Sequence, residues 1–234
     1  MTGGEIAAAL AAAQRNPQLV AAALALQQDR LDIAEQLLRA RLREHPIDIA
    51  AIRMMGELAA RLGRYPDAQK LLARALEIAP DFHAARANYV TVLHRQSKFV
   101  EALAQADRLI AEEPHELGHL ALKAAVLVRT GGYAEAIAAY HSILAVHPDQ
   151  PQLWISLGHV LKTVGRQDES VAAYQAAIGQ ADTLGDAWWS LANLKTTRFT
   201  DEELERMRSA LDRAGEAQDR YHLHFALGDR KSVV

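Results

Sequence analysis

The chain contains no cysteine and few aromatic residues, and neither sign of charge dominates. Without cysteine, a disulfide framework and a thiolate metal site are both excluded. This composition fits a reducing, cytoplasmic setting. A formal net charge of −3 on 234 residues gives no electrostatic reason to expect nucleic acid or an anionic membrane as a partner.

Long apolar runs and phosphate-binding motifs are missing too. No window approaches the roughly 18 consecutive apolar residues of a membrane-spanning helix. Residues 1–14 also lack the basic start and cleavable apolar core of a signal peptide. Neither G-x-x-x-x-G-K-S/T nor G-x-G-x-x-G occurs. We therefore expect a soluble chain that, in this form, binds no cofactor and catalyses no reaction.

Alanine is abundant, and the sequence repeats with a constant period, the interval from Pro46 to Pro80. Four prolines stand at this spacing, with an alanine twelve residues before each and a large apolar residue fifteen before. These columns contain Pro46, Pro80, Pro114 and Pro148; Ala34, Ala68, Ala102 and Ala136; and Leu31, Tyr65, Phe99 and Tyr133. A further column holds Ile52, Arg86, Leu120, Trp154 and Trp188, where only Arg86 breaks the apolar pattern. Such columns indicate internal repeats, and we call their common interval the repeat length.

Each unit of this pattern predicts a pair of helices. The proline ends the second helix because it cannot continue one, and Gly63 and Gly131 can take the left-handed conformation that closes the first. One pair cannot offset the ordering entropy of its own residues, about 1.5 kcal/mol each, so the units must stack. The sequence therefore predicts an all-α fold, a right-handed α-solenoid of antiparallel helix pairs.

These columns resemble the tetratricopeptide repeat, whose pattern contains a tryptophan, a leucine-glycine pair, a tyrosine, two alanines with an aromatic between them, and a proline. One unit carries it as Trp154, Leu157-Gly158, Leu161, Ser170, Tyr174 and Ala177, and another as Met55-Gly56, Tyr65, Ala68, Leu72, Ala75 and Pro80. The resemblance predicts an N-terminal helix over 1–14 and units at 15–48, 49–82, 83–116, 117–150 and 151–184. It implies a scaffold that binds a protein or peptide.

The first helix of a sixth pair begins near Gly185, and the repeat pattern then fails. Thr200 and Glu203 form the pattern of a capping box. A helix of about 14 residues should follow, and a further helical segment is expected over 219–227. The predicted buried face of the first of these contains Leu204, Met207 and Leu211. Residues 185–228 are therefore predicted to form the first helix of a sixth pair and a helical connector. We expect the apolar end of this region to allow self-association.

Residues 188–195, 199–201 and 222–228 resemble the connector of bacterial tetratricopeptide-repeat sulfotransferases. The resemblance implies an alternative function: the chain is the substrate-recognition arm of a longer sulfotransferase. The catalytic domain of that family binds phosphoadenosine phosphosulfate through a phosphate loop, which this sequence lacks. Residues 229–234 fit neither a helix nor a cap and resemble a translated sequencing adaptor. The alternative for residues 229–234 is that they are an ordinary frayed terminus.

A formal zinc-protease motif, H-E-x-x-H, spans His115 to His119. Zinc binding requires both histidines on one helical face. His115 follows a predicted helix-ending proline, whereas His119 lies in the first turn of the next helix, so their rings need not share a face. Glu135 and His141, the conceivable third ligands, lie where repeat geometry explains them. We expect no metal site.

The first helix of each unit lines the concave surface of tetratricopeptide repeats. Carried over by position, this face contains Arg53, Glu57, Arg61, Thr91, His94, Arg95, Arg129, His159, Lys162, Thr163 and Asn193, continued by Thr196 and Thr197. The set holds five cations and one anion, which predicts an acidic or carboxylate-ended peptide as partner. The alternative is that these side chains are merely solvated.

Overall fold

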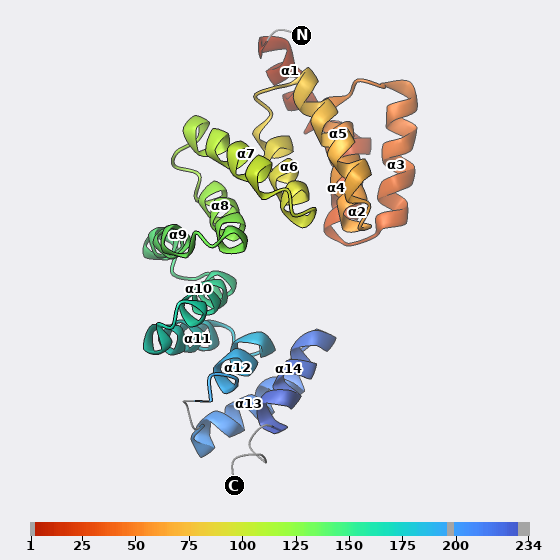
Figure 1. Cartoon of the computed structure of the whole chain (residues 1–234). Helices are drawn as coiled ribbons and strands as arrows, with labels where there is room; N and C mark the ends of the chain where they lie inside the picture. Colours follow the sequence, from red (N-terminus) through yellow and green to blue (C-terminus); the bar gives the residue numbers. More distant parts are fainter. Residues whose placement is uncertain (1–2, 196–198, 229–234) are drawn as a thin grey trace. The chain divides into compact units, whose positions relative to one another are not determined.

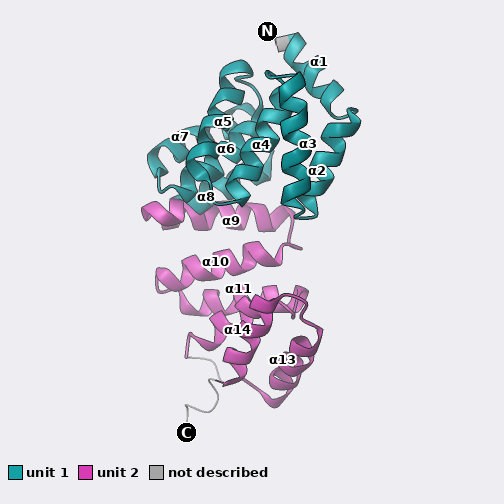
Figure 2. Ribbon diagram, turned by 90° about the vertical axis from the view of Figure 1, so that its right-hand side faces the viewer, with its two compact units in different colours: residues 1–126 teal, residues 127–234 magenta. Residues whose placement is uncertain are grey.

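The computed structural model describes residues 3–195 and 199–228, and these form helices and no strand (Figure 1). The chain divides into two compact units, and the boundary lies between residues 126 and 127 (Figure 2). The first contains α1 (Gly3–Ala13), α2 (Pro17–Gln27), α3 (Leu31–Glu44), α4 (Ile49–Arg61), α5 (Tyr65–Ile78), α6 (His83–Arg95), α7 (Phe99–Glu112) and most of α8 (Leu117–Thr130). The second contains α9 (Tyr133–Val146), α10 (Pro151–Thr163), α11 (Gln167–Gln180), α12 (Gly185–Ala192), α13 (Asp201–Arg213) and α14 (Ala217–Gly228).

Helix starts follow the predicted period. The first helices of five successive pairs begin one repeat length apart, at Ile49, His83, Leu117, Pro151 and Gly185. The second helices begin at Leu31, Tyr65, Phe99, Tyr133 and Gln167 with the same step. The fold is all-α and built from helix pairs, as the sequence predicted.

The turns inside the pairs share one backbone conformation. Positive φ angles of 55° to 84° occur at five positions that are again one repeat length apart. Three of these are glycines, and the other two are Asp29 and Ser97. The predicted role of Gly63 and Gly131 is confirmed, and the same turn forms without glycine at two places.

Small side chains let the helices of a pair approach closely. The alanine column is fully buried, and Ser170 takes its place in α11, where its hydroxyl donates to the Gly158 carbonyl at 2.9 Å. Gly56 and Gly158 lie against large residues of the following helix, Leu72 and Tyr174. A small residue on one helix thus makes room for a large one on the next, as close packing requires.

The column that Arg86 interrupts has a polar function as well as an apolar one. The Trp154 ring N–H donates to the Pro148 carbonyl, and the Trp188 ring N–H donates to the Asp182 carbonyl, both at 2.8 Å. The Arg86 guanidinium donates to the Pro80 carbonyl, also six residues back. Arginine thus satisfies the same helix-end carbonyl as tryptophan.

The last three helices form a terminal layer within the second unit. The predicted capping box is present, since the Glu203 amide donates to the Thr200 hydroxyl at 3.2 Å and the Thr200 amide to the Glu203 carboxylate at 2.8 Å. Trp188 is buried and Trp189 is 38% exposed. On α13 the buried residues are Leu204, Met207 and Ala210, with Leu211 only partly buried.

A hydrogen bond and a ring contact are among the interactions that hold this terminal layer together. The first amide of α12, from Gly185, donates to the Asp219 carboxylate at 2.9 Å. Phe199 packs edge-on against the Trp188 ring, with centroids 6.0 Å apart. The apolar end that the sequence left open is therefore partly covered by α13 and α14.

In the described part of the chain, no helix is both long and apolar enough to cross a membrane. Thr196 and Thr197, predicted to extend the concave face, and the tail 229–234 lie outside the described residues.

Candidate functional site

A pocket of about 380 Å³ lies between α4 and α6 in the first unit. It contains four of the residues predicted for the concave face, two from each helix: Glu57, Arg61, Thr91 and Arg95. The remaining lining includes Ala60, Tyr65, Leu72, Asn88 and Val92. The pocket therefore has an apolar floor and a polar rim, as a peptide site requires.

Glu57 reduces the positive charge expected at this face. Its two carboxylate oxygens lie 3.0 Å from the Arg53 guanidinium and 2.9 Å from that of Arg61. Arg61 also donates to the Leu26 carbonyl at 2.6 Å. Two arginines share the Glu57 carboxylate, and Arg61 also lies 3.8 Å from the Asp29 carboxylate, so Arg53 and Arg61 add little net positive charge to this face.

Two hydrogen-bond donors of the pocket are unused. Arg95 has no ion-pair or hydrogen-bond partner among the described residues. The Asn88 amide nitrogen is buried and also lacks a partner. Since the Thr91 hydroxyl already donates to the Ala87 carbonyl at 3.2 Å, it is free only to accept. The helix α6 side of the pocket therefore holds an exposed, unpaired cation and a buried amide without a partner.

One predicted residue of this region lies elsewhere, and a polar lining residue, Asn88, was not predicted. His94 packs its ring against Phe99, with centroids 5.9 Å apart, and does not line the pocket. Asn88 was not foreseen, although it precedes Thr91 and Arg95 by three and seven residues. That spacing, i, i+3, i+7, places all three on one helix face and could have identified it.

In the second unit, the predicted His159 forms a group with two residues that were not predicted, Ser190 and Asp186. Its Nε2 atom lies 3.0 Å from the Ser190 hydroxyl and 3.8 Å from the Asp186 carboxylate. Ser190 in turn donates to Asp186 at 3.0 Å. Burial lowers the pKa of His159, although Asp186 opposes the shift and Lys162 adds to it. The histidine is therefore neutral near pH 7, and the acidic Asp186 was not predicted.

The other predicted residues of this unit are dispersed. Arg129 lies in the last turn of α8. Lys162 is exposed near the end of α10, where Thr163 donates its hydroxyl to the His159 carbonyl at 2.8 Å. Asn193 caps α12 through its backbone amide, which donates to the Trp189 carbonyl at 2.9 Å.

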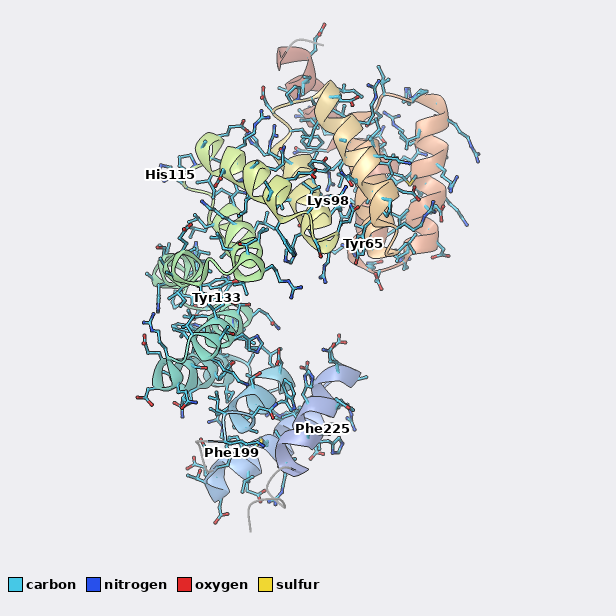
Figure 3. The ribbon with its side chains drawn as sticks, in the orientation of Figure 1. Tyr65, Lys98, His115, Tyr133, Phe199 and Phe225 are labelled. Atoms are coloured by element: carbon cyan, nitrogen blue, oxygen red, sulfur yellow. The ribbon has the colours of Figure 1, made fainter. Side chains whose placement is uncertain are left out.

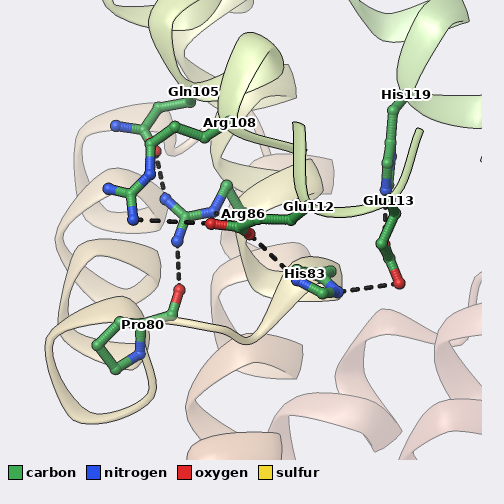
Figure 4. A network of polar contacts seen from close by, with 8 residues as sticks. All are labelled: Pro80, His83, Arg86, Gln105, Arg108, Glu112, Glu113 and His119. Atoms are coloured by element: carbon green, nitrogen blue, oxygen red, sulfur yellow. Dashed lines mark hydrogen bonds and ion pairs between the residues drawn. The ribbon is translucent and has the colours of Figure 1, made fainter. Parts of the chain in front are cut away.

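The zinc-like motif has a structural explanation. His119 is buried, and its Nε2 lies 2.8 Å from the Glu113 carboxylate (Figure 4). Glu116 accepts from the Gly118 amide at 3.0 Å, and His115 points into solvent (Figure 3). No group of three or more potential metal ligands occurs in residues 3–195 and 199–228.

Figure 4 also shows a polar network that joins α6, α7 and the start of α8. His83 bridges two carboxylates, 3.1 Å from Glu112 and 3.0 Å from Glu113. The hydrogen bond with His119 lowers the pKa of Glu113, and the nearby His83 lowers it further. The buried Arg86 donates to Gln105 at 2.7 Å. These residues hold α6, α7 and the start of α8 together.

The sequence profile of the tetratricopeptide repeat matches residues 53–116 and 122–185, more than half of the chain. The chain belongs to the tetratricopeptide repeat family. This is a scaffold family, and the comparisons place the chain in no enzyme family. A search of curated proteins gives no significant match.

Solved tetratricopeptide-repeat structures have the same fold. A thermophilic protein from Thermus thermophilus is 24% identical and aligns over 76% of this chain and 98% of its own, with a TM-score of 0.61. A protein from Parabacteroides merdae is 16% identical over 90% of this chain and 97% of its own, at 0.62. YrrB, which has an unusual peptide-binding site, is 17% identical over 83% and 97%, at 0.55. At these identities the likeness concerns the fold.

Proposed function

We propose that the chain is a scaffold that binds a peptide carboxylate, from an acidic side chain or a C-terminus, in the pocket between α4 and α6. The observation that carries this proposal is the pair of unused donors on α6, the Arg95 guanidinium and the Asn88 amide. Arginine hydrogen-bonds carboxylates strongly and a carboxylate offers two oxygens, so one oxygen would accept from Arg95, and the buried Asn88 amide would turn toward the pocket to donate to the other. Membership of a scaffold family supports this reading, as does the peptide-binding site of YrrB.

The apolar floor of the pocket fits the side chain that adjoins this carboxylate. Leu72 and Val92 are buried beneath it, and Ala60 adds a small apolar surface. Glu57 does not repel the ligand strongly, since Arg53 and Arg61 already neutralise it. We propose that the scaffold acts in a cytoplasmic setting, which the absence of cysteine supports.

The relation to sulfotransferases remains a prediction. The family match ends at residue 185, and none of the matches described above is to a sulfotransferase. The uninterrupted gene sequence tests it: a glycine-rich phosphate loop within about 60 codons after Gly228 supports the recognition-arm hypothesis. An authentic stop codon after Val234 contradicts it.

Fluorescence anisotropy tests carboxylate binding. The probe is a short labelled peptide with alternating leucine and glutamate and a free C-terminus. Arg95→Glu should weaken binding by about tenfold or more, because a charge-assisted hydrogen bond becomes a repulsion. Asn88→Ala should weaken it about fivefold.

The matched control is Arg74→Glu, which changes the net charge equally on an exposed face of α5 outside the pocket. It should alter affinity less than twofold or so, as expected of a screened surface charge. Equal affinity of the wild type and the Arg95→Glu variant would exclude the pocket as the site. Equal losses from Arg95→Glu and Arg74→Glu would show non-specific attraction.

A further inference from the structure

A larger groove, of about 550 Å³, lies between α3, α4 and α5 on another face of α4. Its apolar surface comes from all three helices and from the turn after α4, where Leu62 is 45% exposed. Leu42, Met55 and Leu71 are partly buried beside it. A groove of this size accommodates several side chains. None of its residues lines the carboxylate pocket.

The next helix junction, one repeat length further along the chain, shows one set of side chains that fills this space. There the Gln69 amide nitrogen lies 3.5 Å from the Tyr89 hydroxyl. The Gln69 oxygen accepts from Gln96 at 3.0 Å and from Lys98 at 2.9 Å. Gln96 also donates to the Tyr65 carbonyl at 3.4 Å, so Tyr65 and Lys98, labelled in Figure 3, belong to one closed junction.

The residues at the equivalent positions of the first junction cannot make these bonds. Glu35, Met55 and Leu62 stand where Gln69, Tyr89 and Gln96 close the second. Glu35 instead pairs with Arg39 on its own helix at 2.7 Å. Arg64, in the position of Lys98, pairs locally with Asp67 at 2.7 Å. The first junction therefore stays open because of its own side chains.

The charge around the open groove is positive. Four cations and two carboxylates line it, and both carboxylates are already paired with Arg39 and Arg64. The remaining cations, Arg43 and Lys70, have no partner among the described residues. An apolar floor between two unpaired cations is complementary to an apolar segment with acidic flanks.

We propose that the groove between α3, α4 and α5 is a second docking site, for a short amphipathic peptide whose leucine-like side chains are flanked by carboxylates. The apolar side chains occupy the space that Tyr89 and Gln96 fill in the next junction. The flanking carboxylates pair with Arg43 and Lys70. This site is separate from the carboxylate pocket, so the scaffold engages partners on two faces of α4.

The test uses a fluorescent peptide with two leucines on one helical face and glutamates at both ends. Glu35→Gln/Met55→Tyr/Leu62→Gln gives the first junction the side chains that close the second, and should weaken binding about tenfold or more. Arg43→Glu/Lys70→Glu should do the same. Its control, Arg15→Glu/Arg30→Glu, makes the same change in net charge outside the groove and should alter affinity less than about twofold.

Further outcomes separate this site from its alternatives. If circular dichroism shows that the triple variant does not fold, the affinity of Arg43→Glu/Lys70→Glu tests the proposal instead. Retained affinity in that double variant overturns the proposal, as does equal binding of a probe with lysines in place of glutamates. Loss of binding in Arg95→Glu alone assigns the peptide to the carboxylate pocket and overturns the second site. A sedimentation change in the triple variant without peptide identifies a second copy as the occupant, which also overturns it.

Discussion

At the residue scale, facing positions on the two helices of a pair combine a small side chain with a large one. Ala22 is buried with Leu38, and Val90 with Ala106. Gly56 faces Leu72, and in the second unit Gly158 faces Tyr174. The two members of each pair are sixteen positions apart, so side-chain volume is compensated across a helix contact, as close-packed interiors require.

Gly158→Ala tests this compensation. The added methyl would lie 2.5 Å from the Tyr174 ring, so we expect a loss of about 1–3 kcal/mol in the free energy of unfolding. Gly179→Ala on α11 is the matched control, since no atom lies within 4 Å of its added methyl. It should gain about 0.5 kcal/mol from helix propensity. Urea denaturation measures both, and equal effects would contradict the packing argument.

Tyr174 itself carries a polar group that its environment does not satisfy. Its hydroxyl is buried without a hydrogen-bond partner. The neighbouring hydroxyls donate elsewhere, that of Ser170 to Gly158 and that of Ser190 to Asp186. Burial raises the pKa of Tyr174 to about 12, although the nearby serines oppose the shift.

Tyr174→Phe should therefore leave stability unchanged or raise it by up to about 1 kcal/mol, because it removes an unpaired buried hydroxyl. Thermal and urea unfolding measure the change. A loss above about 1 kcal/mol would show that the hydroxyl accepts or donates a stabilising bond in solution.

At the element scale, the turn between paired helices depends on one left-handed residue. Ser97 occupies this position with φ 59°, and Gly63 occupies it with φ 72°. Ser97→Gly should stabilise the first unit by about 0.5–1 kcal/mol, whereas Gly63→Ala should destabilise it by about 1 kcal/mol. No atom lies within 4 Å of the methyl added at Gly63, so the backbone alone is tested. Chemical denaturation should show higher stability for Ser97→Gly and lower stability for Gly63→Ala. Lower stability in both variants would contradict the turn assignment.

Helix positions were predictable because they depend on local spacing. The constant repeat length located the helix pairs, and the capping box located the start of α13. The packing of α12 against α14 was not predictable, because Gly185 and Asp219 meet only in the folded chain. The partial neutralisation of Arg53 and Arg61 by Glu57 could be suspected from i, i+4 spacing. The contact between His159 and Asp186 depends on neighbouring helices and could not.

At the scale of the whole molecule, the terminal layer leaves aromatic side chains on its surface. Tyr221 is 59% exposed and Phe225 50% exposed, with ring centroids 4.5 Å apart. Exposed apolar patches favour association. We expect sedimentation velocity to show reversible self-association at high concentration, which Tyr221→Ser/Phe225→Ser abolishes. A mass that is constant with concentration in the wild type would refute this prediction.

Helix α4 holds a central place in the proposed binding, with a carboxylate pocket on one face and an open apolar groove on another. Both features follow from side chains at repeat positions that other units fill differently. A repeat scaffold can thus vary its ligands without changing its helices.

Nuclear magnetic resonance of the labelled protein tests carboxylate binding most directly, because it reports each side chain separately. On titration with a peptide that ends in a free carboxylate, we expect the Asn88 side-chain amide and the Arg95 guanidinium signals to shift together and saturate together. A control peptide with an amidated C-terminus and no acidic residue should leave both signals unchanged. Saturable binding of the first peptide without movement of either signal would contradict the assignment of this pocket.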